Sequence, residues 1–482
     1  MNRTIQKIFA WTLIIAFFII APAIALYSMG YRLSRDNTDN TILTSTGGVR
    51  INTRIPYEIT INNKLESKSP FLKVGLSPQD LDVALSLDGY QSWAKKISIQ
   101  PSLVQLISDV TLFPKDPDLN KFTDLSTARN ISRVPDASSI LYTSYNPNES
   151  GLWLLNLETK LRKRLTDSVD LGGLDNQDYS DFVWNANGTT LAFKTSINNA
   201  FQYFVIINAN TSPVIFNITN LIPVADTVAS PVKIVSLDSD RLFFIQAGAL
   251  YEITQQFITR SEALVGDIKQ YAFANESIYY TSNKDIAKNL IRVYNLDTKK
   301  ASAIFYPNLA ISKIFITPSQ SHIIILDDKQ KAWLKAIGTD TPEFNQIADI
   351  EIKDIQFSLD SKKALLKAEN SLSMLYLDTI EGYRSRIEGD FDTLYTSKNI
   401  ITKSEFWEPN SEYIIFVEDN KLKTVESDTR GVINVYTLLE NTKNFASIRI
   451  GNDAKTLTQT PNNEIQYFQF PIRTPLINFN NN

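Results

Sequence analysis

The sequence contains no cysteine and a single histidine, His322. Disulfides, thiolate metal sites and cysteine nucleophiles are therefore excluded, as is chemistry that needs two imidazoles. His322 lies beside an apolar run, where we expect a structural imidazole at the start of a strand. We predict no catalytic residue, no metal ligand, no cofactor-binding residue and no cofactor.

Glycine is scarce, at 16 residues, and neither a phosphate-binding glycine loop nor a Gly-x-Ser-x-Gly elbow occurs. Basic residues are not in excess: 48 Lys and Arg stand against 52 Asp and Glu, so no nucleic-acid partner is expected. The dense basic run at 160–164 is expected to be a solvated hairpin edge. The acidic loop Asp170–Asp181 lacks the EF-hand spacing and favours a solvated loop, with a calcium site as the alternative.

The N-terminal segment is the longest stretch without charge. Ile8–Ile20 is almost purely apolar, and no charged residue occurs from Ile8 through Tyr31, which is enough length to cross a bilayer core of about 30 Å. Arg3 and Lys7 come before it and favour retention of the N-terminus in the cytoplasm. We predict a single-pass anchor at 1–31 in the cell membrane, with the bulk of the chain extracytoplasmic. A cleaved signal peptide, ending at Ala23-Ile24-Ala25, is the alternative.

Residues 32–46 are polar and lack periodicity, so we expect a flexible tether with a reach of roughly 20 Å. From residue 47 apolar residues alternate, as in Val83, Leu85 and Leu87, and turn residues such as Asp88-Gly89 separate the runs. This pattern predicts a small β-sandwich over 47–115. A short hinge is expected to follow Phe113–Pro117.

Four segments of this predicted sandwich resemble a PEGA domain: Gly48–Ile51, Ile55–Asn63, Ser69-Pro70 and Gly89–Trp93. Pro56-Tyr57-Glu58 stands where the family has the Pro-Glu-Gly-Ala motif. The resemblance implies an extracytoplasmic module that supports interactions in the cell envelope. Tyr90 and Trp93 are expected to close the core, with an exposed carbohydrate platform as the alternative.

The region 118–475 contains self-similar units, each an apolar strand end, a turn rich in Asn, Asp, Gly or Pro, and a second apolar strand. The turns at Phe315 and Phe357 are 42 residues apart. A period near forty residues with several strands indicates a β-propeller. The eight units are Pro135–Tyr142, Trp184–Phe193, Val235–Phe244, Phe273–Tyr280, Phe315–Ile325, Phe357–Leu366, Trp407–Phe416 and Asn452–Leu457. Seven blades result instead if the outermost segments merge into one ring-closing blade.

The units resemble TolB-like and other WD-related bacterial propellers, although none contains a Trp-Asp dipeptide. We expect Trp184 and Trp407 to be buried at matching positions beside Phe193 and Phe416. The predicted fold is all-β: a transmembrane helix, a PEGA-like sandwich, a seven- or eight-bladed propeller and a tail at 476–482.

The function predicted from these features is a non-enzymatic, membrane-anchored binding or scaffolding protein of the cell envelope. Its propeller would be the platform for a protein or glycan partner. The first alternative is a propeller enzyme that acts on envelope glycans through paired carboxylates. The second is an architectural protein that assembles with copies of itself, and the sequence leaves the oligomeric state open.

Overall fold

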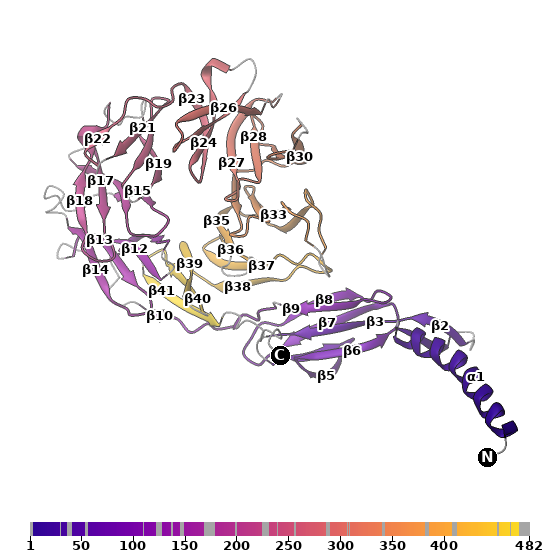
Figure 1. Cartoon of the computed structure of the whole chain (residues 1–482). Helices are drawn as coiled ribbons and strands as arrows, with labels where there is room; N and C mark the ends of the chain where they lie inside the picture. Colours follow the sequence, from indigo (N-terminus) through magenta and orange to yellow (C-terminus); the bar gives the residue numbers. More distant parts are fainter. Residues whose placement is uncertain are drawn as a thin grey trace.

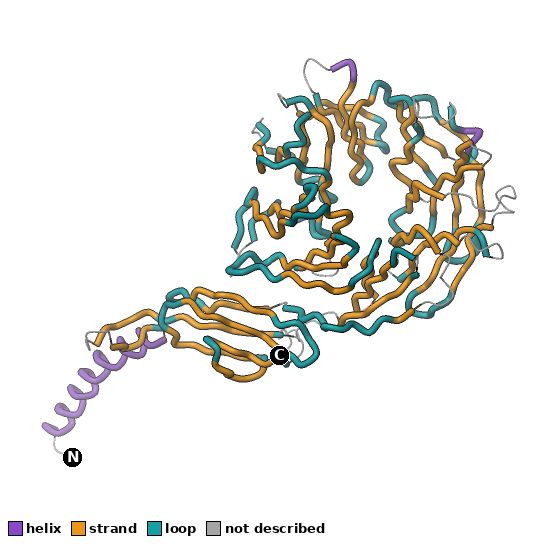
Figure 2. Tube along the Cα trace, turned by 180° about the vertical axis from the view of Figure 1, so that it is seen from behind, coloured by secondary structure: helices purple, strands orange, loops and turns teal. Residues whose placement is uncertain are grey.

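The computed structural model describes residues 3–28, 30–35, 41–53, 56–108, 110–121, 128–135, 138–144, 149–167, 179–197, 200–223, 231–238, 240–254, 257–285, 290–305, 307, 309–339, 343–380, 385–406, 412–450, 453–462 and 464–471. Figures 1 and 2 show one helix at the N-terminus, an elongated β module, and a ring of sheets.

Helix α1 (Arg3–Ser28) projects away from the rest of the molecule (Figure 1). Within the described residues it is the one helix long and apolar enough to cross a membrane, and none of its stretch Trp11–Ser28 is buried. A helix that is apolar all round suits a lipid environment better than water. A signal sequence has the same features, so both interpretations from the sequence fit this helix.

The segment predicted as a flexible tether instead contains a hairpin of β1 (Tyr31–Arg35) and β2 (Thr41–Ser45). The tether prediction is therefore wrong for these residues. The β-branched residues of Thr41-Ile42-Leu43-Thr44 favour a strand, and their pairing partner β1 ends at Arg35, six residues before Thr41. The hairpin ends at a fixed joint, because Thr46 donates its backbone N–H to the carbonyl of Gly30 over 2.8 Å.

The two-sheet module (residues 47–112) follows. One sheet has the order β6-β3-β9 and the other β5-β4-β7-β8. Side chains from both sheets form a single buried core, which includes Val49, Ile59 and Trp93. The strands are β3 (Gly47–Asn52), β4 (Glu58–Ile61), β5 (Lys64–Lys68), β6 (Phe71–Leu76), β7 (Asp80–Ser86), β8 (Trp93–Ser98) and β9 (Val104–Ser108).

The ring (residues 120–471) contains eight four-stranded antiparallel sheets among its described residues. In the first four sheets the strands are β11 (Ala128–Arg133), β12 (Ser139–Ser144), β13 (Gly151–Asn156), β14 (Arg162–Asp167); β15 (Tyr179–Trp184), β16 (Leu191–Ile197), β17 (Ala200–Ile207), β18 (Val214–Asn217); β19 (Lys233–Leu237), β20 (Leu242–Gln246), β21 (Ala249–Thr254), β22 (Thr259–Arg260); β23 (Ile268–Ala274), β24 (Ser277–Ser282), β25 (Ile291–Asn295) and β26 (Lys300–Phe305).

In the last four sheets the strands are β27 (Ile311–Ile316), β28 (His322–Asp327), β29 (Ala332–Ala336), β30 (Asn345–Ala348); β31 (Asp354–Phe357), β32 (Lys363–Lys367), β33 (Ser371–Tyr376), β34 (Phe391–Thr396); β35 (Ile401–Phe406), β36 (Tyr413–Glu418), β37 (Lys421–Glu426), β38 (Val435–Leu439); β39 (Asn444–Ile450), β40 (Asp453–Gln459), β41 (Ile465–Pro471) and β10 (Asn120–Lys121). The 3-10 turns η2 (Thr219–Leu221) and η3 (Asn283–Asp285) lie between strands.

The second strand of each sheet explains why the ring holds together. In β28 every residue is buried, and alternate side chains enter different clusters: Ile323 and Ile325 pack towards the preceding sheet, Ile324 and Leu326 towards the following one. A strand covered on both faces reads as a continuous apolar run. Eight such clusters join each sheet to its two neighbours, including the last sheet to the first through Leu457 and Ile140.

This closed arrangement of radial sheets is that of a β-propeller. Strand β10, from the start of the ring, pairs with β41 at its end, so one sheet contains both ends of the domain. The predicted units Trp184–Phe193, Phe273–Tyr280, Phe315–Ile325 and Phe357–Leu366 each coincide with the turn between the first two strands of one sheet. The predicted residues Trp407–Ser411 and Asn452 lie outside the described residues. Trp184 shares a cluster with the buried Phe193, as expected, but is itself only half-buried.

The chain is packed on both sides of the step from the module to the ring. Leu112 belongs to the core of the two-sheet module, whereas the next residue, Phe113, is fully buried in the ring. The Phe113 ring lies 5.3 Å from that of Tyr413 and 5.6 Å from that of Tyr436, between centroids. The chain therefore passes from one core to the other between adjacent residues.

Candidate functional site at the junction of module and ring

Edge strand β8 of the two-sheet module faces the sheet β35–β38 of the ring. Trp93, at the start of β8, lies in the module core and is 1% exposed, which is the place predicted for it; its partner Tyr90 packs against the same core and is half-buried. The indole Nε1 of Trp93 donates a hydrogen bond of 2.8 Å to Oε2 of Glu426, at the end of β37. One side chain thus serves the module core and the contact with the ring.

Lys95 is the electrostatic centre of this junction. Its side chain is fully buried, and Nζ lies 2.9 Å from Oε1 of Glu426 and 3.8 Å from Oδ1 of Asp428. The ammonium group also donates to the backbone carbonyls of Asp428 and, over 3.0 Å, of Arg430. A buried ammonium requires such partners, because removing it from water without them costs several kcal/mol.

Neutral hydrogen bonds extend the contact along β38. Asn434 Nδ2 donates to the Ala94 carbonyl over 3.2 Å, and Gln91 Nε2 donates to the Thr437 carbonyl over 2.9 Å. The hydroxyl of Tyr436 donates to the Ser92 carbonyl over 3.3 Å. Burial, together with the charge of Glu426, raises the pKa of Tyr436, so this phenol stays a donor at neutral pH.

Gly431 allows the two backbones to approach. It has φ +63°, and a Cβ at this position would lie 2.9 Å from the Lys96 carbonyl oxygen. Any side chain would therefore push β8 away from the loop between β37 and β38.

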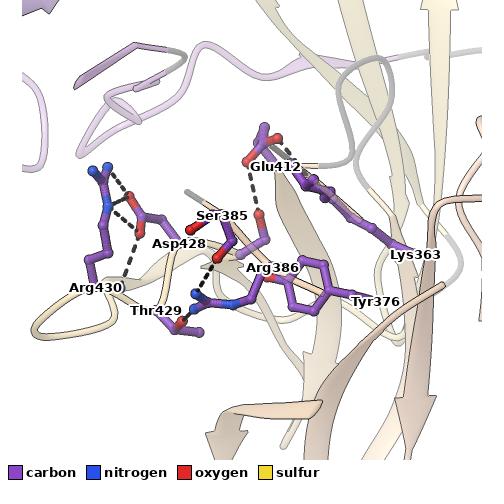
Figure 3. Close-up of a pocket in the computed structure, with 10 residues that line it drawn as sticks. Lys363, Tyr376, Ser385, Arg386, Glu412, Asp428, Thr429 and Arg430 are labelled. Atoms are coloured by element: carbon purple, nitrogen blue, oxygen red, sulfur yellow. Dashed lines mark hydrogen bonds and ion pairs between the residues drawn. The ribbon is translucent and has the colours of Figure 1, made fainter. Parts of the chain in front are cut away.

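A cavity of about 150 Å³ lies next to the junction (Figure 3). Its lining comes from two neighbouring sheets: Lys363, Tyr376, Ile380, Ser385, Arg386, Glu412, Ser427, Asp428, Thr429 and Arg430. The bases in this lining are paired with acids. Lys363 lies 3.2 Å from Glu412, Arg386 3.0 Å from Asp392, and Arg430 2.7 Å from Asp428.

The electrostatics of the cavity favour a fixed charge pattern over acid–base chemistry. Burial raises the pKa of Tyr376 to about 12, so its phenol is protonated at neutral pH. Burial lowers the pKa of Arg386, but Asp392 and Tyr376 raise it by more, and the net direction is upward. Glu412 accepts hydrogen bonds from both Lys363 and Ser427. These contacts tie β32 to the loops before β36 and after β37, and so support the sheet on which the module rests.

The other candidates from the sequence lie elsewhere. His322 begins β28, as predicted, and is 6% exposed; its Nε2 lies 3.2 Å from Glu388 Oε1, so it bridges neighbouring sheets. Arg162–Arg164 lie on β14, the outermost strand of its sheet, as expected for a hairpin edge. Asp170–Asp178 fall outside the described residues, and Asp181 forms a 2.8 Å ion pair with Lys194. Among the residues that are described, no group of three or more acidic or histidine side chains suits a metal ion.

The junction residues were missed, although the sequence holds a signal for them. In Trp93-Ala94-Lys95-Lys96-Ile97 the period of two places Lys95 on the same face as Trp93 and Ile97. A lysine on the buried face of a strand needs an acidic partner. The sequence does not say that this partner is Glu426, because the two residues are far apart along the chain.

Comparisons with known proteins do not place this chain in a family. No family model and no curated protein matches the sequence. Among solved structures, Hsv2 of Kluyveromyces lactis is similar over 64% of this chain and 97% of its own, at 12% identity and a TM-score of 0.42. The C-terminal WD40 domain of Sif2 is similar over 74% of this chain and 99% of its own, at 12% identity and a TM-score of 0.47. The β-propeller assignment rests on the sheets described above.

Proposed function

We propose that this protein is a membrane-anchored scaffold of the cell envelope, in which an eight-bladed propeller outside the cytoplasm is the binding platform. In this proposal α1 is the anchor, and the two-sheet module is a PEGA-like spacer between membrane and propeller. The blade count is supported by the eight sheets and by the eight clusters between them. The apolar, unburied surface of α1 supports the anchor.

The observation that carries the proposal is the buried Lys95 at the junction. A flexible linker would be sufficient to tether a binding domain. Burying an ammonium between two acids adds little net stability compared with apolar packing, and its use is to specify one geometry. Together with the packed Leu112-Phe113 step, it supports a function in which the orientation of the propeller relative to the membrane matters.

The proposal assigns binding, not catalysis, to the propeller. The carboxylates that line the cavity are engaged by bases, as in Glu412 with Lys363 and Asp428 with Arg430. Carboxylates paired in this way are already engaged by neighbouring side chains, which favours a structural role for them. A rigid ring with variable connecting loops suits recognition of a protein partner.

The fixed geometry can be tested with spin labels, because the chain has no cysteine to interfere. Cysteines introduced at the exposed residues Lys68, in β5, and Lys300, in β26, place one label on each unit. We expect a narrow distribution of distances between the labels in the full chain, and a broad one after Lys95→Met. A broad distribution in the unsubstituted chain would refute the rigid spacer.

Topology and partner require a second experiment in intact cells. Protease added outside should digest the module and the ring, and crosslinking should capture a protein partner. Protection of the whole chain until lysis would contradict the extracytoplasmic assignment. A mature N-terminus at Leu26 would replace the anchor with a cleaved signal peptide. Glycan turnover that one Asp or Glu substitution in the propeller abolishes would favour the enzyme.

A further inference from the structure

The two outer faces of the two-sheet module differ in chemistry. Strands β4 and β7 of one sheet expose Glu58, Asp80 and Asp82. Strands β3, β6 and β9, which form the other sheet, contain no acidic residue. The contacts of Trp93 and Lys95 with the ring come from β8, which belongs to the first sheet. The sheet without acids therefore lies on the other side of the module core from this contact.

The outer side of the sheet β6-β3-β9 is apolar. Six residues, which we name the apolar face, are placed by the strand registers in two rows across it: Val74, Gly48 and Val104 in one row, and Leu72, Arg50 and Leu106 in the other. Leu72 is 61% exposed, Val74 59% and Val104 48%. Single exposed apolar residues are ordinary on a protein surface, whereas a group of neighbours marks a contact with something else.

One end of the apolar face lies beside the end of α1. The Thr46 N–H donates to the Gly30 carbonyl at the joint after α1, and the Ser102 N–H donates to the Thr46 carbonyl over 2.9 Å. Ser102 is followed by Leu103, which is 53% exposed, and then by β9. Figure 1 likewise shows β2, which ends at this joint, between α1 and the module. The face thus starts where the apolar helix ends.

Strand β6 reaches the same place from the other edge of the sheet. A Cβ at its Gly75 would lie 4.0 Å from Nε of Arg32. The guanidinium of Arg32 lies 3.6 Å from the ring centroid of Tyr27, in the last turn of α1, and donates to the Tyr27 carbonyl over 2.7 Å. Tyrosine and arginine at the end of an apolar helix are typical of the boundary between lipid and water.

The size of the apolar face decides what it contacts. Three strands of five or six residues cover about 15 Å by about 18 Å, or under about 300 Å². A stable protein interface buries about 800 Å² on each partner, so this face alone is too small to hold a second copy or another protein. A lipid surface has no such requirement, because α1 already holds the face beside it and a weak second contact is then sufficient.

We propose that the apolar face rests on the surface of the bilayer in which α1 is anchored. Leu72 and Val74 then lie at the boundary of headgroups and acyl chains, and Arg50 extends its apolar stem there with its charge at the lipid phosphates. The inference rests on the anchor proposed above. Helix α1 alone fixes the distance of the module from the membrane, whereas a second contact also fixes its tilt, which the buried Lys95 transmits to the propeller.

The test uses the full chain in vesicles that contain phosphatidylglycerol, with one fluorophore on a single introduced cysteine, since the chain has none of its own. The labelled sites are Val74→Cys on the apolar face, Asp82→Cys on the opposite outer face as the matched control, and Phe17→Cys in α1. Quenching by lipids with a nitroxide near the headgroup should be at least about threefold stronger at Val74 than at Asp82, because an interfacial face lies about 5–10 Å into this boundary.

A substitution tests the apolar character of the face. Leu72→Glu, in a chain labelled at Val104→Cys, should reduce the quenching by about half or more, because a carboxylate resists burial and anionic lipids repel it. Thr60→Glu is the matched control, since Thr60 alternates with the buried Ile59 and Ile61 on the opposite outer face, and it should leave the quenching unchanged. The unfolding transition should be the same in both variants, because neither residue is buried.

The remaining outcomes separate the inference from the proposed anchor. Equal, weak quenching at Val74 and Asp82, with strong quenching at Phe17, would overturn the contact of the apolar face and leave the anchor in place. Absence of quenching at Phe17 would overturn the anchor and the inference with it. A label at Val74 that is protected from aqueous iodide but not quenched by lipid would show that protein covers the face, and would refute the lipid contact.

Discussion

The two-sheet module and the ring bury their apolar residues in different ways. The module has one core between two sheets, and it is complete within residues 49–112. The ring has no common centre of packing: its eight clusters each belong to two neighbouring sheets, and the second strands feed two clusters at once. Stability in the module is therefore local, whereas in the ring it depends on closure. The junction connects these two kinds of core through buried charge.

The largest expected effect comes from the ring. Phe193 is fully buried between the sheets that contain β11 and β15. Phe193→Ala should lower the free energy of unfolding by about 3–5 kcal/mol, because a large core cavity remains. Urea unfolding followed by fluorescence measures the loss. Leu161→Ala, at a residue 69% exposed, is the control and should change little. Equal effects of the two substitutions would mean that this cluster does not bear on stability.

Lys95→Met tests whether module and ring are coupled. The substitution leaves Glu426 without its cation, whereas Asp428 keeps its ion pair with Arg430, and it should cost about 3–5 kcal/mol. We expect unfolding to change from one transition to two, with the module and the ring unfolding separately. Lys96→Met is the control, because its side chain is 58% exposed and its acid Asp80 lies 3.9 Å away. A single unchanged transition in Lys95→Met would show that the charges do not couple the two units.

A smaller effect is expected from the indole at the same place. Trp93→Phe keeps an aromatic side chain in the module core and removes the hydrogen bond to Glu426. The loss should be about 1–3 kcal/mol, because a buried carboxylate loses a donor. Trp153→Phe removes a partly exposed hydrogen bond to the Glu149 carbonyl in the ring and should cost less. Calorimetry measures the loss of stability in both variants. A larger loss for Trp153→Phe than for Trp93→Phe would contradict the role assigned to the junction.

The smallest effect concerns pH and a carboxylate inside the ring. Burial raises the pKa of Glu418, but hydrogen bonds from Lys423, Ser397 and Tyr395 lower it by more, so the net direction is downward. The stabilisation is therefore present above the unfolded pKa, near about 4.3, and is lost as the pH falls through the folded value. Denaturant unfolding across acidic pH should show this loss, and Glu418→Gln should reduce it. If stability falls with pH in Glu418→Gln as it does in the unsubstituted chain, Glu418 is not the source of the acid sensitivity.

The repeating part of the fold could be predicted because it is encoded locally. Trp184–Phe193 and Phe357–Leu366 each contain a turn and its two strands, and both match the first two strands of a sheet. The hairpin β1–β2 was missed because Arg32, Asp36 and Asp39 give the segment the polarity of a linker. Its two strands are defined by their hydrogen bonding to each other, and the polarity of the residues does not indicate that pairing.

Only the module side of the junction could be predicted from the sequence. The alternation around Lys95 places a charge on a buried face, but nothing in that stretch names its partners. The Trp93–Glu426 bond spans 333 residues, and a single sequence does not encode such a pairing in any local pattern. The packing of Phe113 was missed for the same reason, since its partners Tyr413 and Tyr436 lie some three hundred residues further on.

The order in which the chain is made gives this distance a consequence. Synthesis runs from the N-terminus, so the two-sheet module can fold as soon as its own residues have emerged. At that stage Lys95 is exposed to solvent, because Glu426 and Asp428 have not yet been synthesised. The ring cannot close until β41 has been synthesised and pairs with β10, the first strand of the ring in the chain. A nascent molecule therefore spends most of its synthesis as a finished module followed by an open arc, with unpaired edges that a chaperone could recognise.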